Sequence, residues 1–94
     1  MLILAKIIEL LKALGDKRRL EIIELLLQKR FCVRALAKRL DISESAVSQQ
    51  LKILRETGLV LGEKKGYFVH YTVQKERLKE AAQYLYELSQ KNSR

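Results

Sequence analysis

The segment ISESAVSQQLKILRETGLV, residues 42–60, carries side chains suited to contacting a nucleic acid. Val47, Leu51 and Leu54 recur at helical spacing, so one face of this segment is expected to be buried. The opposite face is hydrogen-bonding and free of acids, unlike an ordinary solvated helix, which pairs Glu with Lys. Serine, glutamine and lysine can bond to base edges or phosphates. The face is therefore predicted to enter a major groove, with a plain polar surface as the alternative. Its residues are Ser45, Ser48, Gln49 and Lys52.

The other groups that could do chemistry are one cysteine and one histidine. Cys32 cannot form an intramolecular disulfide, and we expect it at the edge of the core. The alternative is redox sensing, because Arg30 and Arg34 flank it. His70 is expected on a strand as a surface residue or a DNA contact. One cysteine and one histidine, without a cluster of aspartates, do not form a plausible catalytic set. We therefore do not expect an enzyme.

Composition favours a polyanionic partner. The chain has 94 residues and a net charge of +8, which fits nucleic acid or an acidic membrane surface. The first segment, MLILAKIIELLKALG, is interrupted by charges and lacks a cleavage site, so we expect neither a signal peptide nor a membrane span. Its few cations also make it a poor ligand for anionic lipid. The expected location is the cytoplasm, with no membrane partner.

Apolar periodicity predicts five helices and one hairpin in a single domain, residues 1–94. The helices are expected over residues 2–14, from Asp16 to about Lys29, around Leu36–Leu40, over 43–57 and over 75–91. Residues 59–73 alternate with period two, and KKG between them is typical of a hairpin turn. The fold class is therefore mostly α with a small β-hairpin, in the order α-α-α-α-β-β-α. Residues 34–57 form a helix-turn-helix and residues 59–73 its wing.

Basic residues around the helix-turn-helix extend the predicted interface. Lys64 and Lys65, at the expected hairpin turn, would hold phosphates. Arg34 and Lys38 lie on the helix expected to cross the DNA backbone. The full predicted DNA-binding set is Ser43, Ser45, Ala46, Ser48, Gln49, Lys52, Lys38, Arg34, Lys64 and Lys65.

The two terminal helices, residues 1–14 and 75–91, are predicted to form a homodimer. The first is apolar over more of its circumference than one small domain can bury, and the last has the spacing of a helix–helix seam. An unpaired chain of this size would expose a large apolar patch. The alternative is that both helices only cover their own core. The predicted interface residues are Leu4, Ile7, Ile8, Leu11, Leu78, Ala81, Leu85 and Leu88.

Three segments resemble the ArsR/SmtB family of bacterial and archaeal winged-helix repressors. They are KALGDKRRLEIIELL, LAKRLDISESAVSQQLKILRETGLV and GYFVHYTV, and together they cover most of the chain. Family members often have His where Gln50 stands and Pro where Lys17 stands; neither change threatens the fold. The resemblance implies a homodimer that binds double-stranded DNA at an imperfect palindrome in a promoter and is released by an inducer.

The metal sites of that family are not matched. In RFCVRAL, Cys32 stands at the first cysteine of the family's Cys-x-Cys pair, and Arg34 stands at the second. Residues 75–91 contain no His or Asp, which the family's other site type uses. No metal or cofactor is therefore expected, and the inducer is unknown. The prediction is a sequence-specific transcriptional regulator acting as a repressor. The alternatives are a winged-helix interaction module without DNA binding and a redox-responsive repressor that uses Cys32.

Overall fold

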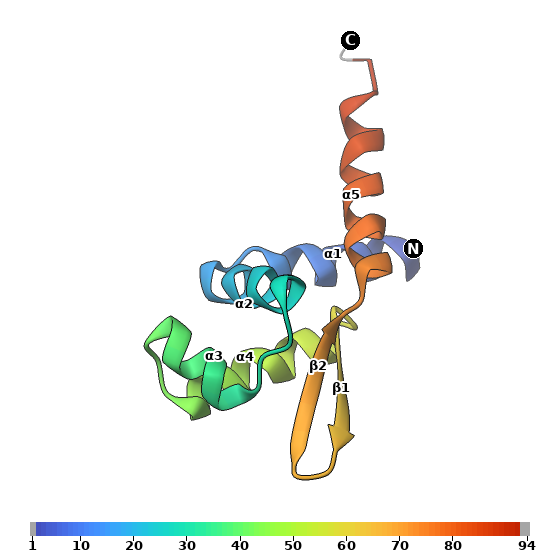
Figure 1. The fold of residues 1–94 in the computed structure, drawn as a ribbon. Coiled ribbons are helices and arrows are strands. Elements are labelled where there is room, and N and C mark those ends of the chain that lie inside the picture. Colours follow the sequence, from blue (N-terminus) through green and yellow to red (C-terminus); the bar gives the residue numbers. More distant parts are fainter. Residues whose placement is uncertain (1, 93–94) are drawn as a thin grey trace.

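The computed structural model describes residues 2–92 and has the predicted order of elements (Figure 1). Four helices come first, followed by an antiparallel two-stranded hairpin and a last helix. The fold class predicted from the sequence is thereby confirmed. The elements are α1 (Leu2–Leu14), α2 (Lys17–Gln28), α3 (Val33–Leu40), α4 (Glu44–Glu56), β1 (Val60–Lys65), β2 (Phe68–Val73) and α5 (Lys75–Ser89).

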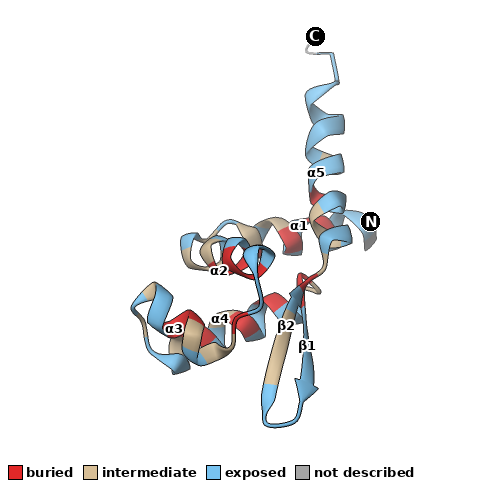
Figure 2. Ribbon diagram, in the orientation of Figure 1, coloured by how far each residue is buried: buried red, intermediate tan, exposed pale blue. Residues whose placement is uncertain are grey.

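The core lies where the helices meet the base of the hairpin (Figure 2). A fully buried Val, Leu or Ile side chain stabilises the folded state by about 1.5–3 kcal/mol relative to the same side chain left exposed. Within the described part of the chain, no polar or charged residue is buried. The core therefore depends on apolar packing. Its largest fully buried side chains are Ile22, Leu36, Leu51, Leu54, Leu59, Val47 and Val60.

Local hydrogen bonds at the helix ends fix the helix-turn-helix. The Ser43 hydroxyl accepts a bond of 3.0 Å from the Ala46 N–H, which caps α4 as predicted. The turn before it depends on Asp41, which has φ 57° and the left-handed conformation. The Ile42 N–H donates to the Ala37 carbonyl at 3.1 Å, so α3 closes with the bond pattern that usually ends at a glycine.

Gly58 ends α4 in the same way. Its φ is +77°, and the Leu59 N–H behind it donates to the Leu54 carbonyl at 2.9 Å. Leu59 and Val60 then enter the core, so the cap aims the chain from α4 directly into β1.

The hairpin turn lies one step later than the sequence pattern indicated. Lys64 and Lys65 are the last two residues of β1, paired with Val69 and Phe68. Gly66 and Tyr67 form the turn instead of KKG. Gly66 has φ +64°, and the positive φ at the first central position is what a two-residue loop of type II′ requires. The lysines therefore precede the tip on β1, and Tyr67 lies at the tip itself.

The last helix leaves the body of the molecule. Its first half packs against α1 and buries Ala81, and its second half extends away from the other elements (Figures 1 and 2). Every residue from Leu85 to Ser89 is exposed. The molecule is elongated as a result, with extents of 54 × 24 × 21 Å.

Candidate nucleic-acid interface

The four polar residues predicted to face DNA on α4 are all exposed. They stand opposite Val47, Leu51 and Leu54, which have no exposed surface. The helix is thus divided between a packed stripe and an open hydrogen-bonding face. Among the ion pairs of the described residues, none involves Lys52, so its charge is available to an external anion.

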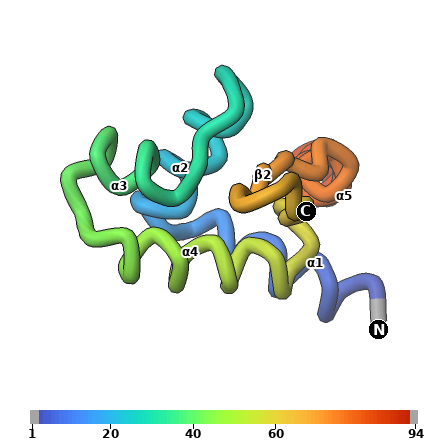
Figure 3. Tube along the Cα trace, turned by 60° about the horizontal axis from the view of Figure 1, so that its bottom comes forward, coloured from blue at the N-terminus to red at the C-terminus, as the bar shows by residue number. Residues whose placement is uncertain are grey.

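α3, α4 and the hairpin lie together at one end of the molecule, away from the free half of α5 (Figure 1). With that end turned forward, α4 runs across the molecule (Figure 3). Arg34 and Lys38 are exposed on α3, which buries Leu36 and Ala37 on its other side. The structure therefore brings the predicted basic residues of α3 to the same end as α4.

The hairpin tip reaches the start of the helix-turn-helix. A groove of about 290 Å³ lies between them and is lined by Arg34, Glu44, Tyr67 and Phe68, among others. The two wing lysines differ in their surroundings. Lys65 Nζ lies 3.5 Å from Glu63 Oε1, whereas Lys64 forms no ion pair within the described residues. Lys64 is the wing cation better placed to hold an external phosphate.

Two residues of the predicted set have structural roles. The Ser43 hydroxyl is occupied by the cap on Ala46 N–H, and Ala46 itself is half-buried. Glu44 follows the cap in the first turn of α4, where its charge suits the positive end of the helix dipole. The open face thus begins at Ser45.

Arg19 and Gln50 form a connection that the sequence did not predict. Arg19 Nε donates to the Ala13 carbonyl at 2.6 Å, and Nη1 donates to Gln50 Oε1 at 2.9 Å. These bonds tie the end of α1 and the start of α2 to the middle of α4. Gln50 is noticed in the sequence only as a departure from the family pattern. No local spacing links it to a residue 31 positions earlier.

The chemical groups outside the interface are isolated. Cys32 is half-buried at the N-cap position of α3, at the expected edge of the core. His70 stands opposite Glu63 in the register of the hairpin, and its Nδ1 is buried without a hydrogen-bond partner. Over residues 2–92, no three His, Cys, Asp or Glu residues lie close enough together to hold a metal ion. No helix there is long and apolar enough to cross a membrane.

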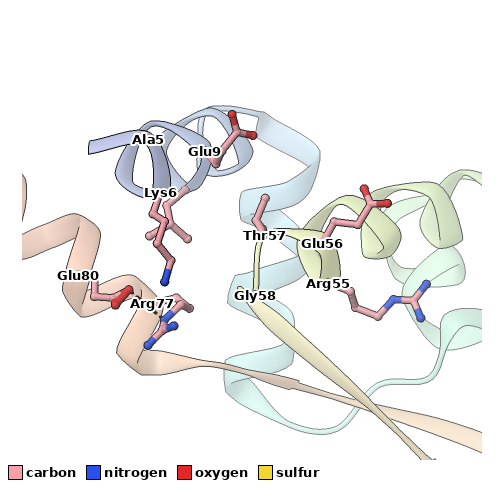
Figure 4. Close-up of a pocket in the computed structure, with 10 residues that line it drawn as sticks. Ala5, Lys6, Glu9, Arg55, Glu56, Thr57, Gly58, Arg77 and Glu80 are labelled. Atoms are coloured by element: carbon pink, nitrogen blue, oxygen red, sulfur yellow. Dashed lines mark ion pairs between the residues drawn. The ribbon is translucent and has the colours of Figure 1, made fainter. Parts of the chain in front are cut away.

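A cleft of about 590 Å³ separates α1, the end of α4 and the start of α5 (Figure 4). Lys6, Arg77 and Glu80 point toward one another in it, and Arg77 Nε lies 3.0 Å from Glu80 Oε1. Glu9 and Glu56 point away from the cleft. The C-terminal end of α4 is therefore adjacent to both terminal helices.

The residues predicted for a dimer interface fall into two groups. Ile7 and Ala81 are buried in the chain's own core, and Leu11 and Leu78 pack partly against it. The rest remain accessible. A second cleft of about 580 Å³ lies between α1 and α5 and is lined by Ile3, Ile7 and Tyr84, among others. The accessible members are Leu4, Ile8, Leu85 and Leu88.

Comparison with known proteins agrees with this geometry. Residues 16–61 match the sequence model of a family described as "Bacterial regulatory protein, arsR family". The transcriptional activator HlyU of Vibrio cholerae is 40% identical over 84 residues, which cover 89% of this chain and 78% of that protein. The arsenical resistance operon repressor of Escherichia coli is 45% identical over 65 residues, which cover 68% of this chain and only 56% of that repressor.

Solved structures share the whole arrangement. A homodimeric winged helix-turn-helix DNA-binding domain from Mycobacterium bovis superimposes with a TM-score of 0.76 at 25% identity. The superposition covers 96% of this chain and 84% of that one.

Proposed function

Because the chain belongs to the ArsR family of bacterial regulatory proteins, and so to DNA-binding transcriptional regulators, we propose that it binds a palindromic promoter site as a homodimer and represses transcription. The observation that carries the proposal is the exposed hydrogen-bonding face of α4 formed by Ser45, Ser48, Gln49 and Lys52, with the acids Glu44 and Glu56 confined to the two ends of the helix. A helix of this kind beside a wing can enter a major groove and bond to base edges. Because promoter DNA would be its target, the proposed location is the cytoplasm.

Two-fold symmetry in the protein would be matched by symmetry in the DNA. Two copies of α4 related by a dimer axis read two half-sites of opposite orientation, which makes the operator a palindrome. The homodimeric relative from Mycobacterium bovis supports this arrangement. So do the exposed leucines of α1 and α5, which a second copy would cover.

The repressor role is the finer part of the proposal. The Escherichia coli relative is named a repressor, whereas the Vibrio cholerae relative is named an activator. A protein that covers promoter DNA blocks polymerase directly, whereas activation needs an additional favourable contact. Repression is therefore the simpler outcome, because it needs nothing beyond binding to the promoter.

Selection from a randomised duplex library tests the DNA-binding proposal. The full chain should retrieve duplexes that share two inverted half-sites, and these should bind more tightly than scrambled duplexes of equal length. Equal affinity for selected and scrambled duplexes would contradict it and favour the interaction-module alternative. Placing the selected site over a reporter promoter then tests the direction of regulation. Expression should fall when the protein is present, and a rise would assign an activator.

A further inference from the structure

The tip of the wing presents an aromatic pair that the chain itself does not use. Tyr67 is 101% exposed and Phe68 is 62% exposed, so neither contributes appreciably to the core. A Cβ added at Gly66 would meet nothing within 4 Å, so the space around the turn glycine is open. The turn requires a glycine at position 66, but nothing in its backbone requires an aromatic residue at position 67.

The position of this pair identifies what it can contact. The groove lined by Glu44, Tyr67 and Phe68 puts the tip beside the first turn of α4. Major and minor grooves alternate along a duplex, so an element beside a helix in the major groove faces the adjacent minor groove. Lys64 and Lys65 directly precede the tip on β1. Lys64, which forms no ion pair among the described residues, gives the tip the positive charge that a phosphate-lined groove attracts.

We propose that the Tyr67 ring enters the minor groove next to each half-site and stacks against a base step that it partly opens, with Phe68 supporting it. The proposal rests on the proposed function, because it assumes that α4 occupies the major groove. Apolar side chains inserted between base steps unstack them and kink the duplex. Aromatic rings are also suited to stacking on bases of any sequence, because every base has a π-face. Flexible steps such as TA, which are more easily opened, should be favoured at that position.

The phenol group is not needed for this role. The ring supplies the stacking surface, and the lysines supply the attraction to phosphates. Tyr67→Phe should therefore behave like the wild type and Tyr67→Ala should not. Leu61→Ala is the matched control, because Leu61 is an exposed apolar residue on the same hairpin, near its base. All three changes are at exposed positions, so thermal melting should confirm that the variants remain folded.

The test uses a duplex selected from a random library, with 2-aminopurine replacing one adenine at a time, because this base fluoresces more strongly when it is unstacked. Wild type, Tyr67→Phe and Leu61→Ala should raise the fluorescence at one step flanking each half-site. Tyr67→Ala should abolish that rise and weaken binding about tenfold, within the range expected for loss of one stacked base.

The possible failures are distinguishable. If the wild type selects a palindrome but no flanking base unstacks, and Tyr67→Ala binds it as tightly, the insertion is wrong and the proposed function stands. If the wild type prefers no duplex over any other, both the insertion of Tyr67 and the proposed function are wrong. If Tyr67→Ala instead loses binding to vesicles of phosphatidylglycerol while its DNA binding is unchanged, the tip serves a membrane and the proposal is overturned.

Discussion

At the residue scale, the proposed interface separates residues that read bases from residues that hold phosphates. Ser48 and Gln49 lie on α4, next to the buried stripe yet exposed themselves. Lys64 and Lys65 lie on the wing, at the end of β1. Base contacts discriminate between sequences, whereas phosphate contacts act on all sequences alike. The two groups should therefore respond differently to mutation.

Gln49→Ala should reduce the preference for the selected site over a mutated one by about 1–3 kcal/mol, the value of a good bidentate base contact. The double change Lys64→Ala with Lys65→Ala should weaken binding to both duplexes equally. It should also reduce the slope of log K against log salt by about one per lost phosphate contact. Most of that reduction should come from Lys64, because Lys65 is already paired with Glu63. Titrations at several salt concentrations measure both effects. Loss of sequence preference in the lysine variant alone would reverse the assignment.

The hydrogen bond between Arg19 and Gln50 is expected to stabilise the fold and not to contribute to DNA recognition. Arg19→Ala should lower the free energy of unfolding by about 2 kcal/mol, since it removes hydrogen bonds from a charged, mostly buried group. Arg18→Ala is the matched control and should cost no more than about 1 kcal/mol, because its pair with Glu21 is partly exposed and its bond to the Leu40 carbonyl is long, at 3.5 Å. Urea unfolding of both variants measures the difference. Equal losses would show that Arg19 holds α4 no more firmly than its neighbour does.

At the scale of elements, the recognition helix is positioned by its two ends. Ser43 caps the start of α4, and Gly58 turns the chain from the end of α4 into β1. Asp41 takes the left-handed conformation in the turn before it. A non-glycine residue tolerates that conformation at some cost, and aspartate is among the residues that adopt it most readily.

Gly58→Ala should destabilise the protein by about 1–2 kcal/mol because an L side chain is strained at φ +77°. Steric overlap is not the cause of this loss, since the nearest atom to an added Cβ is on the Arg77 side chain at 3.7 Å, an ordinary contact distance. Gly58→Asn is the control, because asparagine accepts this conformation more readily, and it should lose less. Thermal or urea unfolding separates the two. A larger loss for Asn than for Ala would show that the side-chain volume beside Arg77 decides the cost.

Periodicity predicted the elements well because each buried stripe repeats with the period of its own backbone. It predicted Gly58 as a helix end because glycine is common at that position. It missed the left-handed Asp41 and displaced the hairpin turn, since Lys64 and Lys65 suit either a loop or an exposed strand. It also could not distinguish Ile7, which the chain buries in its own core, from Ile8, which it leaves exposed. Neighbouring residues on an apolar helix look alike until the packing is known.

At the scale of the whole molecule, the free half of α5 is the feature that the chain alone does not account for. Leu85 and Leu88 are 49% and 47% exposed on a helix that extends beyond the core. The hollow between α1 and α5 is lined by Ile3 and Tyr84, among others. A second copy that packed α5 against these residues would bury both surfaces by a two-fold arrangement.

Sedimentation equilibrium at micromolar concentration should therefore give about twice the chain mass of 11.0 kDa, as expected if the terminal helices of two copies cover each other. The double change Leu85→Glu with Leu88→Glu should yield monomers, because it would place charges in the apolar seam. Leu27→Glu is the matched control: Leu27 is 46% exposed, but lies on α2, and its variant should remain dimeric.

The monomeric variant should still bind a single half-site weakly while losing the advantage of the palindrome, since two linked half-sites bind more tightly than one. A wild-type monomer that persists at high concentration would contradict both the dimer and the palindrome, and a dimer that survives the α5 substitutions would move the interface elsewhere.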